Sequence, residues 1–194
     1  MADARIERLV DRQEIADLLT EYCRALDLMD LAAIARVFTA DCRVEYGPEE
    51  RLQSQGAEGV AKSLERMWRW ARTSHHLSNI QVEFESADAA RAISYVIAWH
   101  ERPDGTTATV LGQYHDRLRR MQEGWRIAER RMLMNGNTQG FTVNLYRTPR
   151  RPAPAGWGAR FSRPSPRRGP RALSSTSRHP PRICRRAGPS SPAT

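Results

Sequence analysis

The sequence of 194 residues predicts an α+β fold, with helices first and an antiparallel sheet after them. Apolar residues recur with the 3.6-residue period of a helix up to about residue 72. From residue 74 to residue 135 they alternate with the two-residue period of a strand, and turn residues separate the later strands. We therefore expect helices packed on one face of a curved sheet, with a ligand pocket between the two layers.

Three helices are predicted in the first part of the chain. The first covers about residues 4–29 and is amphipathic. Asp30 is the expected N-cap of a short second helix at residues 31–38, and the third helix covers residues 56–72. The apolar face of the first helix is made of Ile6, Leu9, Val10, Ile15, Leu18, Leu19, Tyr22 and Leu26.

Strands follow the helical region, and one short strand interrupts it. Residues 39–42 are expected to end the second helix, and residues 43–47 alternate as a short strand. Pro103-Asp-Gly105 and Glu123-Gly124 supply turn signals between the last strands. Four long strands are predicted at residues 74–86, 90–102, 106–122 and 124–135.

The strand at residues 90–102 has two different faces, because successive side chains point to opposite sides of a sheet. The face that ends at His100 is otherwise made of small residues and leaves room for a ligand, whereas the opposite face is bulky and suits packing or subunit contact. The small face is Ala92, Ser94, Val96, Ala98 and His100, and the bulky face is Ile93, Tyr95, Ile97 and Trp99. Strict alternation also places Asn79 beside His75, and Arg131 beside Trp125.

Charge divides the chain at about residue 147. The whole chain has a net charge of +9, but residues 1–147 hold all 22 acidic residues and only 20 of the 31 basic ones. Residues 148–194 hold eleven Arg, ten of the twelve Pro and no acid. Such a composition cannot bury enough apolar surface to offset the entropy lost on ordering. We expect one domain at residues 1–147 and a disordered Arg/Pro/Ser-rich tail at residues 148–194, and we hypothesise that the tail is a frameshifted or read-through sequence.

Several classes of partner and location are not expected. A basic tail can bind nucleic acid, but this one lacks RG repeats, regular aromatic residues and an amphipathic period, so nucleic acid is not an expected partner. Cys23, Cys42 and Cys184 have neither metal-ligand spacing nor the density of a disulfide scaffold. The sequence contains no secretory signal and no apolar run as long as a membrane span. We expect a cytoplasmic protein with reduced thiols.

Asp27 and His75 are the candidate catalytic pair. Asp27 ends the apolar face of the first helix, and His75 begins a long strand. A carboxylate and an imidazole that face one cavity transfer protons without a metal or cofactor. Each residue also has an ordinary structural interpretation, as a cap or solvated charge for the Asp and as a hydrogen-bonded structural residue for the His. His75 and His76 are adjacent on a strand, so their rings diverge and no metal site is expected.

Residues 1–147 resemble the SnoaL-like branch of the nuclear transport factor 2-like superfamily, whose fold is a cone of helices packed on a curved sheet. The segments with the resemblance follow one another in the family's order. They are IADLLTEYCRALD (15–27), VFTADCRVEYG (37–47), HHLSN (75–79), GQYHD (112–116) and GWRIAERR (124–131). The resemblance implies three N-terminal helices on a curved antiparallel sheet.

Cofactor-free lyases in this family, similar to scytalone dehydratase, bile-acid dehydratase and hexachlorocyclohexane dehydrochlorinase, use an Asp–His dyad. The resemblance implies that Asp27 and His75 form this dyad, with no metal and no cofactor. Leu26 stands where the scytalone type has a further Tyr, so scytalone itself is not implied as the substrate. Arg130 is an alternative to Arg131 in the pocket. The residues implied to bind substrate are Tyr22, Tyr46, Asn79, His100 and Arg131.

The implied function is that of a dehydratase-like lyase or isomerase acting on a cyclic, hydrophobic small molecule by Asp–His acid–base catalysis. Two alternatives remain open. One is a non-catalytic domain for small-molecule binding or oligomerisation, and the other is the small subunit of a ring-hydroxylating dioxygenase, which shares the fold. Because relatives commonly form homodimers or homotrimers through the outer sheet face, we expect the bulky face of the strand at residues 90–102 to form such a contact.

Overall fold

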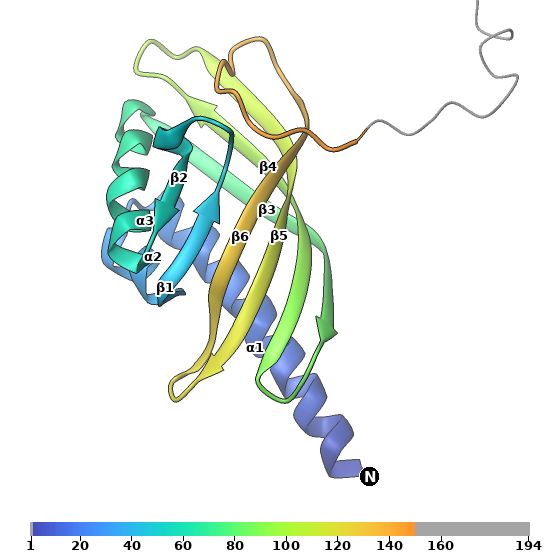
Figure 1. Ribbon diagram of the computed structural model, residues 1–194. Coiled ribbons are helices and arrows are strands. Elements are labelled where there is room, and N and C mark those ends of the chain that lie inside the picture. The colour runs from blue at the N-terminus through green and yellow to red at the C-terminus, as the bar shows by residue number, and fades with distance from the viewer. Residues whose placement is uncertain (1, 150–194) are drawn as a thin grey trace, which may run out of the picture. The chain divides into compact units, whose positions relative to one another are not determined.

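The computed structural model describes residues 2–149, and helices cover one side of a curved sheet in it (Figure 1). The long helix α1 (Ala2–Asp27) is followed by the short α2 (Leu31–Arg36) and by α3 (Ala57–Leu64). Two 3₁₀ helices, Glu50–Leu52 and Glu65–Arg69, precede β2 and follow α3. Asp30 caps α2, because its carboxylate accepts a 2.9 Å hydrogen bond from the backbone amide of Ala33.

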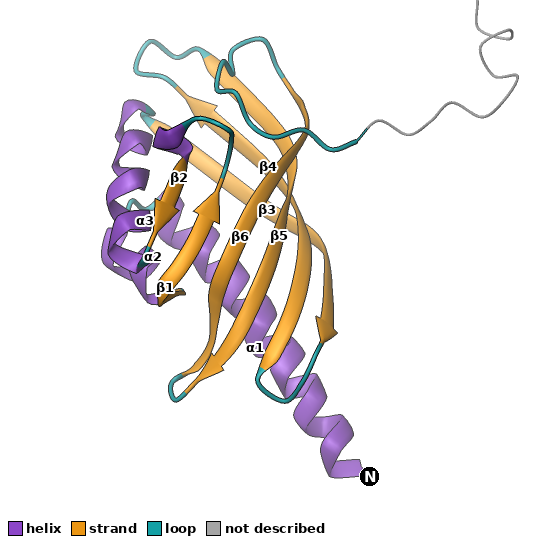
Figure 2. Ribbon diagram, viewed as in Figure 1, coloured by secondary structure: helices purple, strands orange, loops and turns teal. Residues whose placement is uncertain are grey.

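Six strands form one sheet in the order β2-β1-β6-β5-β4-β3 (Figure 2). All neighbouring pairs are antiparallel except β1 and β6, which run parallel. The sheet is open, and its concave face and the helices enclose the core, so the predicted α+β class and the helices-on-sheet arrangement are confirmed. The strands are β1 (Phe38–Glu45), β2 (Gln53–Gln55), β3 (Arg72–Phe84), β4 (Ala89–Glu101), β5 (Thr107–Met121) and β6 (Gly124–Asn137).

Two helix boundaries differ from the sequence prediction. The second helix ends at Arg36, and the residues expected to break it, 39–42, belong to β1. The third helix is α-helical only to Leu64 and continues as a 3₁₀ helix. That change of pitch rotates the following side chains, so Trp68 is 64% exposed whereas Trp70 is buried.

The apolar face of α1 is buried in only its second half. Tyr22 and Leu26 are buried in the core, but Ile6, Leu9 and Val10 are each more than half exposed. Figure 1 shows the reason, because the first turns of α1 extend beyond the end of the sheet. The periodicity therefore predicted the helix correctly and predicted too long a buried face.

Two β-bulges change which residues face the core. The pairing of β3 with β4 shifts between Ser78 and Gln81, and Asn79 has a positive φ of 51° there. In β6 the pairing with β5 shifts around Ala128, which adds one residue to that strand. Because side chains alternate with period two, one extra residue moves every later side chain to the opposite face.

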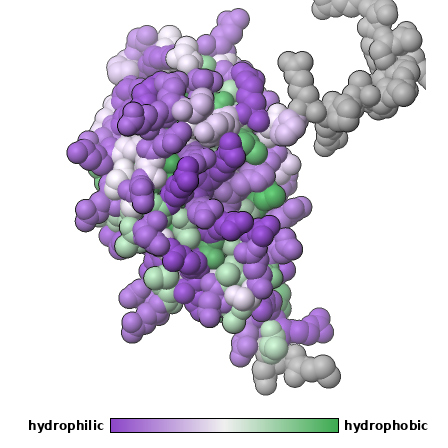
Figure 3. All heavy atoms as spheres, in the orientation of Figure 1, coloured by the Kyte–Doolittle hydropathy of each residue, from purple (hydrophilic) through white to green (hydrophobic). Residues whose placement is uncertain are grey.

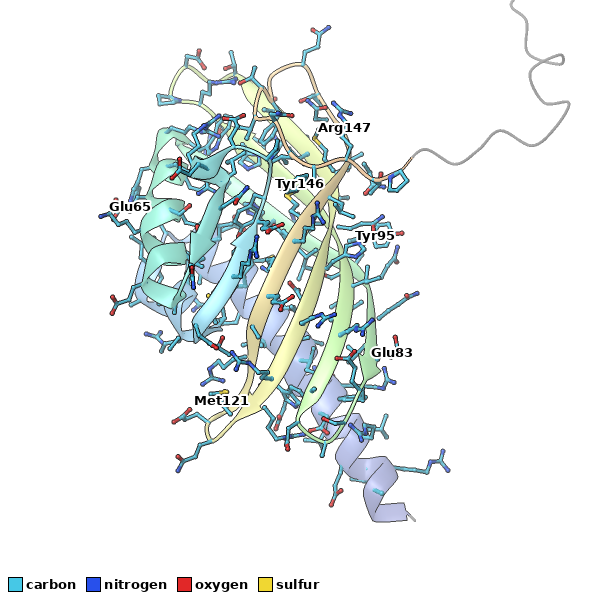
Figure 4. The ribbon with its side chains drawn as sticks, in the orientation of Figure 1. Glu65, Glu83, Tyr95, Met121, Tyr146 and Arg147 are labelled. Atoms are coloured by element: carbon cyan, nitrogen blue, oxygen red, sulfur yellow. The ribbon has the colours of Figure 1, made fainter. Side chains whose placement is uncertain are left out.

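The outer face of the sheet is mostly polar, with scattered apolar residues (Figure 3). Tyr95, Ile97 and Leu111 are 40–48% exposed on this face, and Figure 4 shows the Tyr95 side chain projecting from the sheet. The predicted subunit contact through Ile93, Tyr95, Ile97 and Trp99 stays a prediction. No helix within residues 2–149 is long and apolar enough to cross a membrane. The predicted tail, residues 148–194, lies almost entirely outside the described part of the chain.

Candidate active site

Asp27 and His75 are in direct contact inside the fold. The Nδ1 atom of His75 lies 2.6 Å from Oδ1 of Asp27, and the backbone amide of His75 donates to Oδ2 at 2.8 Å. Thr73, two residues earlier on β3, donates its hydroxyl to Oδ1 at 2.8 Å. The carboxylate at the end of α1 is therefore held by three donors from one strand.

These contacts select one tautomer of the histidine. A carboxylate accepts hydrogen bonds, so the proton of a neutral His75 ring lies on Nδ1 and the Nε2 atom keeps a lone pair. Nε2 has no hydrogen-bond partner among residues 2–149, and His75 lines a cavity between the helices and the sheet. Burial alone would raise the pKa of Asp27, but the hydrogen bonds from His75 and Thr73 outweigh it and lower that pKa. Asp27 therefore remains a carboxylate at neutral pH.

Tyr22 and Tyr46 line the same cavity and bind each other. Tyr22 comes from α1 and Tyr46 follows β1, and their hydroxyl oxygens are 2.5 Å apart. One hydroxyl donates to the other, which leaves one O–H without an acceptor among the described residues. Burial raises the pKa of both phenols, so both stay protonated. The pair can give one hydrogen bond to an oxygen atom in the cavity.

His100 lies next to His75 and faces the cavity, as the small face of its strand predicted. Its ring is perpendicular to that of His75, with centroids 5.4 Å apart, and its Nδ1 lies 3.3 Å from the Ala108 carbonyl oxygen. Burial, together with repulsion by His75, lowers the pKa of His100 to about 4. A neutral His100 with Nδ1 as the donor leaves its Nε2 as a second acceptor.

Arg130, and not Arg131, points into the interior. The bulge at Ala128 reverses the facing of the later β6 residues, so Arg131 is exposed and stacks on Tyr146, with a 4.3 Å distance to the ring centroid. The fully buried Arg130 forms two 2.8 Å hydrogen bonds with Asp116. The prediction that Arg131 faces the pocket is wrong, because a bulge interrupts the strict alternation of side chains along the strand.

The interior arginine lies behind the tyrosines. The Arg130 guanidinium stacks on Tyr22 and Tyr114, at 4.2 and 4.3 Å from the ring centroids. Tyr22 and Tyr114 line the cavity, whereas Arg130 does not. Arg130 therefore contacts the aromatic rings that form the cavity wall and has no direct contact with the cavity. Asp116 was not identified from the sequence as an interior residue. Its position between Tyr114 and Leu118, on the inward-facing row of β5, is the signal that it is buried and needs a partner of opposite charge.

Asn79 is exposed and lies outside the cavity. Strict alternation placed it on the face of His75, but the bulge in β3 turns it outward and brings Ile80 to the core side. Its positive φ explains the residue type, because Asn tolerates the left-handed conformation better than most residues. The prediction that Asn79 shares the face of His75 is wrong.

The cavity is small, and a segment beyond β6 forms one side of it. Its volume is about 60 Å³, and side chains of residues 138–149, which we call the strap, form part of its wall. Phe141 stacks on His100, with centroids 5.6 Å apart. No periodic pattern in the sequence predicts the strap, which has no regular structure beyond one bridge to Met134. The strap residues that line the cavity are Phe141, Val143 and Leu145.

A larger hollow of about 750 Å³ lies elsewhere, on the outer face of the sheet. It is open to solvent and lined by charges of both signs, such as Arg117, Glu129 and Arg131. It is lined by neither Asp27 nor His75. We therefore place the candidate site in the smaller inner cavity.

Within residues 2–149, no group of three or more His, Cys, Asp or Glu side chains could hold a metal ion. His76 points away from the dyad and lies 2.8 Å from the Ser74 hydroxyl. The expected absence of a metal and of a cofactor stays a prediction.

The N-terminal helices and the curved, unclosed sheet define a nuclear transport factor 2-like fold. A model of the SnoaL-like domain family matches residues 7–131, and the chain belongs to that family. Comparison with curated protein sequences found no match.

Solved structures share the fold. A protein of Novosphingobium aromaticivorans assigned as a scytalone dehydratase has 25% identity and a TM-score of 0.70, over 78% of this chain and all of that one. A second protein of that organism, assigned as an aromatic ring hydroxylase, has 27% identity and a TM-score of 0.63, over 67% of this chain and 93% of that one. A hexachlorocyclohexane dehydrochlorinase, LinA type 2, has 21% identity and a TM-score of 0.64, over 78% and 99% of the two chains. Dehydratase-like proteins are thus among its structural neighbours.

Proposed function

We propose that this protein is a cofactor-free lyase or isomerase of the dehydratase kind, in which Asp27 and His75 are the catalytic pair. The observation that supports this most is the 2.6 Å contact between His75 Nδ1 and Asp27, which leaves His75 Nε2 free at the cavity. A carboxylate that fixes the tautomer and stabilises the imidazolium is the arrangement that makes a histidine an effective base.

In the proposed reaction, His75 Nε2 removes a proton from a carbon next to a carbonyl group of a cyclic substrate. The C–H electron pair moves to form an enolate, and Asp27 stabilises the imidazolium. The free O–H of the Tyr22–Tyr46 pair donates a hydrogen bond to the enolate oxygen. The enolate then expels a β-hydroxyl group, which leaves as water with the proton from His75, or it is reprotonated at another carbon. The first outcome is elimination and the second is isomerisation.

The expected rate enhancement is divided between the Asp27–His75 pair and the tyrosine pair. Acid–base catalysis by a positioned side chain contributes about 10²–10⁴-fold in rate. A hydrogen-bond donor aimed at a developing oxyanion contributes about 10²–10³-fold. We assign the first effect to His75 with Asp27 and the second to the tyrosine pair, with His100 as an acceptor for a substrate hydroxyl group.

The small volume of the cavity limits which compounds can enter it. Pockets for drug-sized ligands measure about 300–1,000 Å³, whereas this cavity measures about 60 Å³. A ring compound therefore enters only if part of the wall moves. The strap has no regular secondary structure beyond one bridge, so we propose that Phe141 and its neighbours move aside on binding.

The similarity to the protein assigned as an aromatic ring hydroxylase is the reason to keep one alternative, the small subunit of a ring-hydroxylating dioxygenase. In that case the chain would associate with a larger iron-containing partner, and the Asp27–His75 contact would be structural. Co-purification with such a partner encoded nearby would favour this alternative. A homodimer or homotrimer in the cytoplasm, formed through the row that contains Tyr95 and Ile97, belongs to the enzyme proposal, and light scattering on the purified protein would test the assembly.

The direct test is a screen of hydroxylated cyclic ketones, followed by absorbance of the conjugated product and by loss of the α-proton signal in D₂O. The active protein should lose about 10²–10⁴-fold in kcat in the His75→Ala variant. His76→Ala is the matched control, because His76 is the neighbouring ring and lies outside the cavity. A folded His75→Ala variant with normal turnover would refute the assignment.

A further inference from the structure

Three arginines lie around the outer end of the cavity, and we call them the arginine rim: Arg66, Arg69 and Arg102. Arg66 and Arg69 belong to the 3₁₀ helix after α3 and line the cavity. Arg102 follows β4 and donates to the carbonyl oxygen of Gly140 in the strap. Among residues 2–149, none of the three forms an ion pair with a carboxylate, whereas Arg51, Arg72 and other arginines nearby do.

The rim charges are held close together by an aromatic platform. The guanidinium groups of Arg69 and Arg102 each lie 5.0 Å from the centroid of the Trp70 ring. Arg66 lies 5.3 Å from the centroid of Tyr46, one of the two paired tyrosines. The Trp70 ring also packs on His100, with centroids 4.8 Å apart. The rim is therefore continuous with the candidate catalytic cavity.

The rim arginines repel one another. Burial lowers the pKa of Arg69, and repulsion by Arg66, Arg51 and Arg102 lowers it further. The acidic group nearest the catalytic histidine, Asp27, already accepts three hydrogen bonds. Close like charges without a partner disfavour cations and favour an anion at the same place.

A buried donor at the same place also lacks an acceptor. Trp70 is 8% exposed, and its Nε1 atom has no hydrogen-bond partner among the described residues. A buried donor without a partner is costly, and such donors are usually satisfied by an ordered water molecule or a ligand. An oxyanion on the rim would supply acceptors to the guanidinium groups and to this indole.

We propose that the cavity binds a ring compound that carries a carboxylate, with the carboxylate on the arginine rim and the apolar ring directed toward His75 and the tyrosine pair. Guanidinium groups match the planar geometry of a carboxylate, and aromatic walls suit the ring. The direction of the ring toward His75 depends on the proposed function. The preference for an anion depends only on the rim.

The test uses naphthalene-2-carboxylate and naphthalene-2-carboxamide, which have the same shape and differ in charge. Calorimetry on the full-length protein at low salt should give at least fivefold tighter binding of the carboxylate. Added salt should reduce this preference, because the rim is partly exposed to solvent. Equal affinities for the two compounds, or no measurable binding of the carboxylate at millimolar concentration, would overturn the proposal.

Variants of the rim test whether the preference for the carboxylate depends on these arginines. The preference should disappear in Arg66→Gln/Arg69→Gln and persist in Arg66→Lys/Arg69→Lys. The matched control is Arg43→Gln/Arg117→Gln, which removes the same charge from the outer sheet face, where both arginines are exposed. Retention of the preference in the first variant, or its loss in the control, would contradict the assignment to the rim. The preference should survive in His75→Asn, so the carboxylate site and the catalytic proposal can fail separately.

Discussion

Two acid–base pairs lie inside the same cone, and their surroundings differ. Asp27 and His75 meet at the cavity wall, where the side chain of Asp27 is 24% exposed and one histidine nitrogen is free. Asp116 and Arg130 are fully buried behind Tyr22 and Tyr114, and Arg130 stays charged at every ordinary pH. The first pair has a histidine at the cavity, whereas neither member of the second pair lines the cavity. The comparison assigns proton transfer to the first pair and structural support to the second.

The largest effect is expected from breaking the buried pair. Arg130→Ala should lower the free energy of unfolding by about 3–5 kcal/mol, because it leaves Asp116 buried without its partner. Denaturant unfolding followed by circular dichroism measures this loss. The double variant Arg130→Met/Asp116→Leu should recover much of the stability, since it removes both charges together. A single variant as stable as the native protein would mean that the pair is not structural.

The cavity pair should show the opposite pattern, with activity lost and stability largely kept. Asp27→Asn keeps the shape of the side chain but removes the negative charge that fixes the His75 tautomer. We expect kcat to fall by about 100-fold or more, which corresponds to about 3 kcal/mol of activation free energy. Steady-state kinetics on a substrate from the ketone screen measures this. Unchanged kcat in a folded variant would remove Asp27 from the mechanism.

Acid should separate the two regions further, because Arg130 does not titrate and His100 does. The pKa of His100 is lowered to about 4 in the folded state and is about 6.5 in an unfolded chain. The unfolded state therefore binds the extra proton first, so stability is full above pH 6.5 and falls as the pH drops toward 4. The loss should approach about 3 kcal/mol. Between pH 7 and pH 4.5, the free energy of unfolding should change less with pH in His100→Gln than in the native protein. Equal pH dependence in the two proteins would contradict this cause.

The smallest effect is expected at Thr73, which supports the cavity pair from one side. Thr73→Val removes the 2.8 Å hydrogen bond to Asp27 and keeps the volume of the side chain. A single hydrogen bond to a partly exposed carboxylate is worth about 1 kcal/mol, so kcat should fall about fivefold. Kinetics on Thr73→Val and on the double variant with Asp27→Asn would show whether the two act together. Additive losses would place Thr73 outside the dyad.

The sequence predicted the features that depend on local periodicity. The inward row that ends at His100 followed from strict alternation along an unbroken strand, and the structure confirms it. Asn79 and Arg131 were misplaced because each follows or occupies a bulge, and a bulge depends on pairing with a neighbouring strand that local sequence does not specify. For the same reason Arg130 was named from the sequence only as an alternative to Arg131 in the pocket.

Other parts of the site had no periodic signal at all. The strap follows the last strand without regular structure, so its place over the cavity depends on tertiary contacts such as that of Phe141 with His100. Arg66 and Arg69 were expected within one continuous α-helix, and the change to a 3₁₀ helix after Leu64 alters the directions of their side chains. Contact between Asp27 and His75, 48 residues apart, was implied by family resemblance and not by composition.

The central claim is that Asp27 fixes the tautomer of His75 that leaves Nε2 bare at the cavity. Nitrogen-15 NMR of the histidine ring at pH 8.5 reports directly which ring nitrogen carries the proton. We predict a protonated Nδ1 and a bare Nε2 for His75 in the native protein, and a mixture of tautomers in Asp27→Asn. A native His75 with its proton on Nε2 would contradict the account.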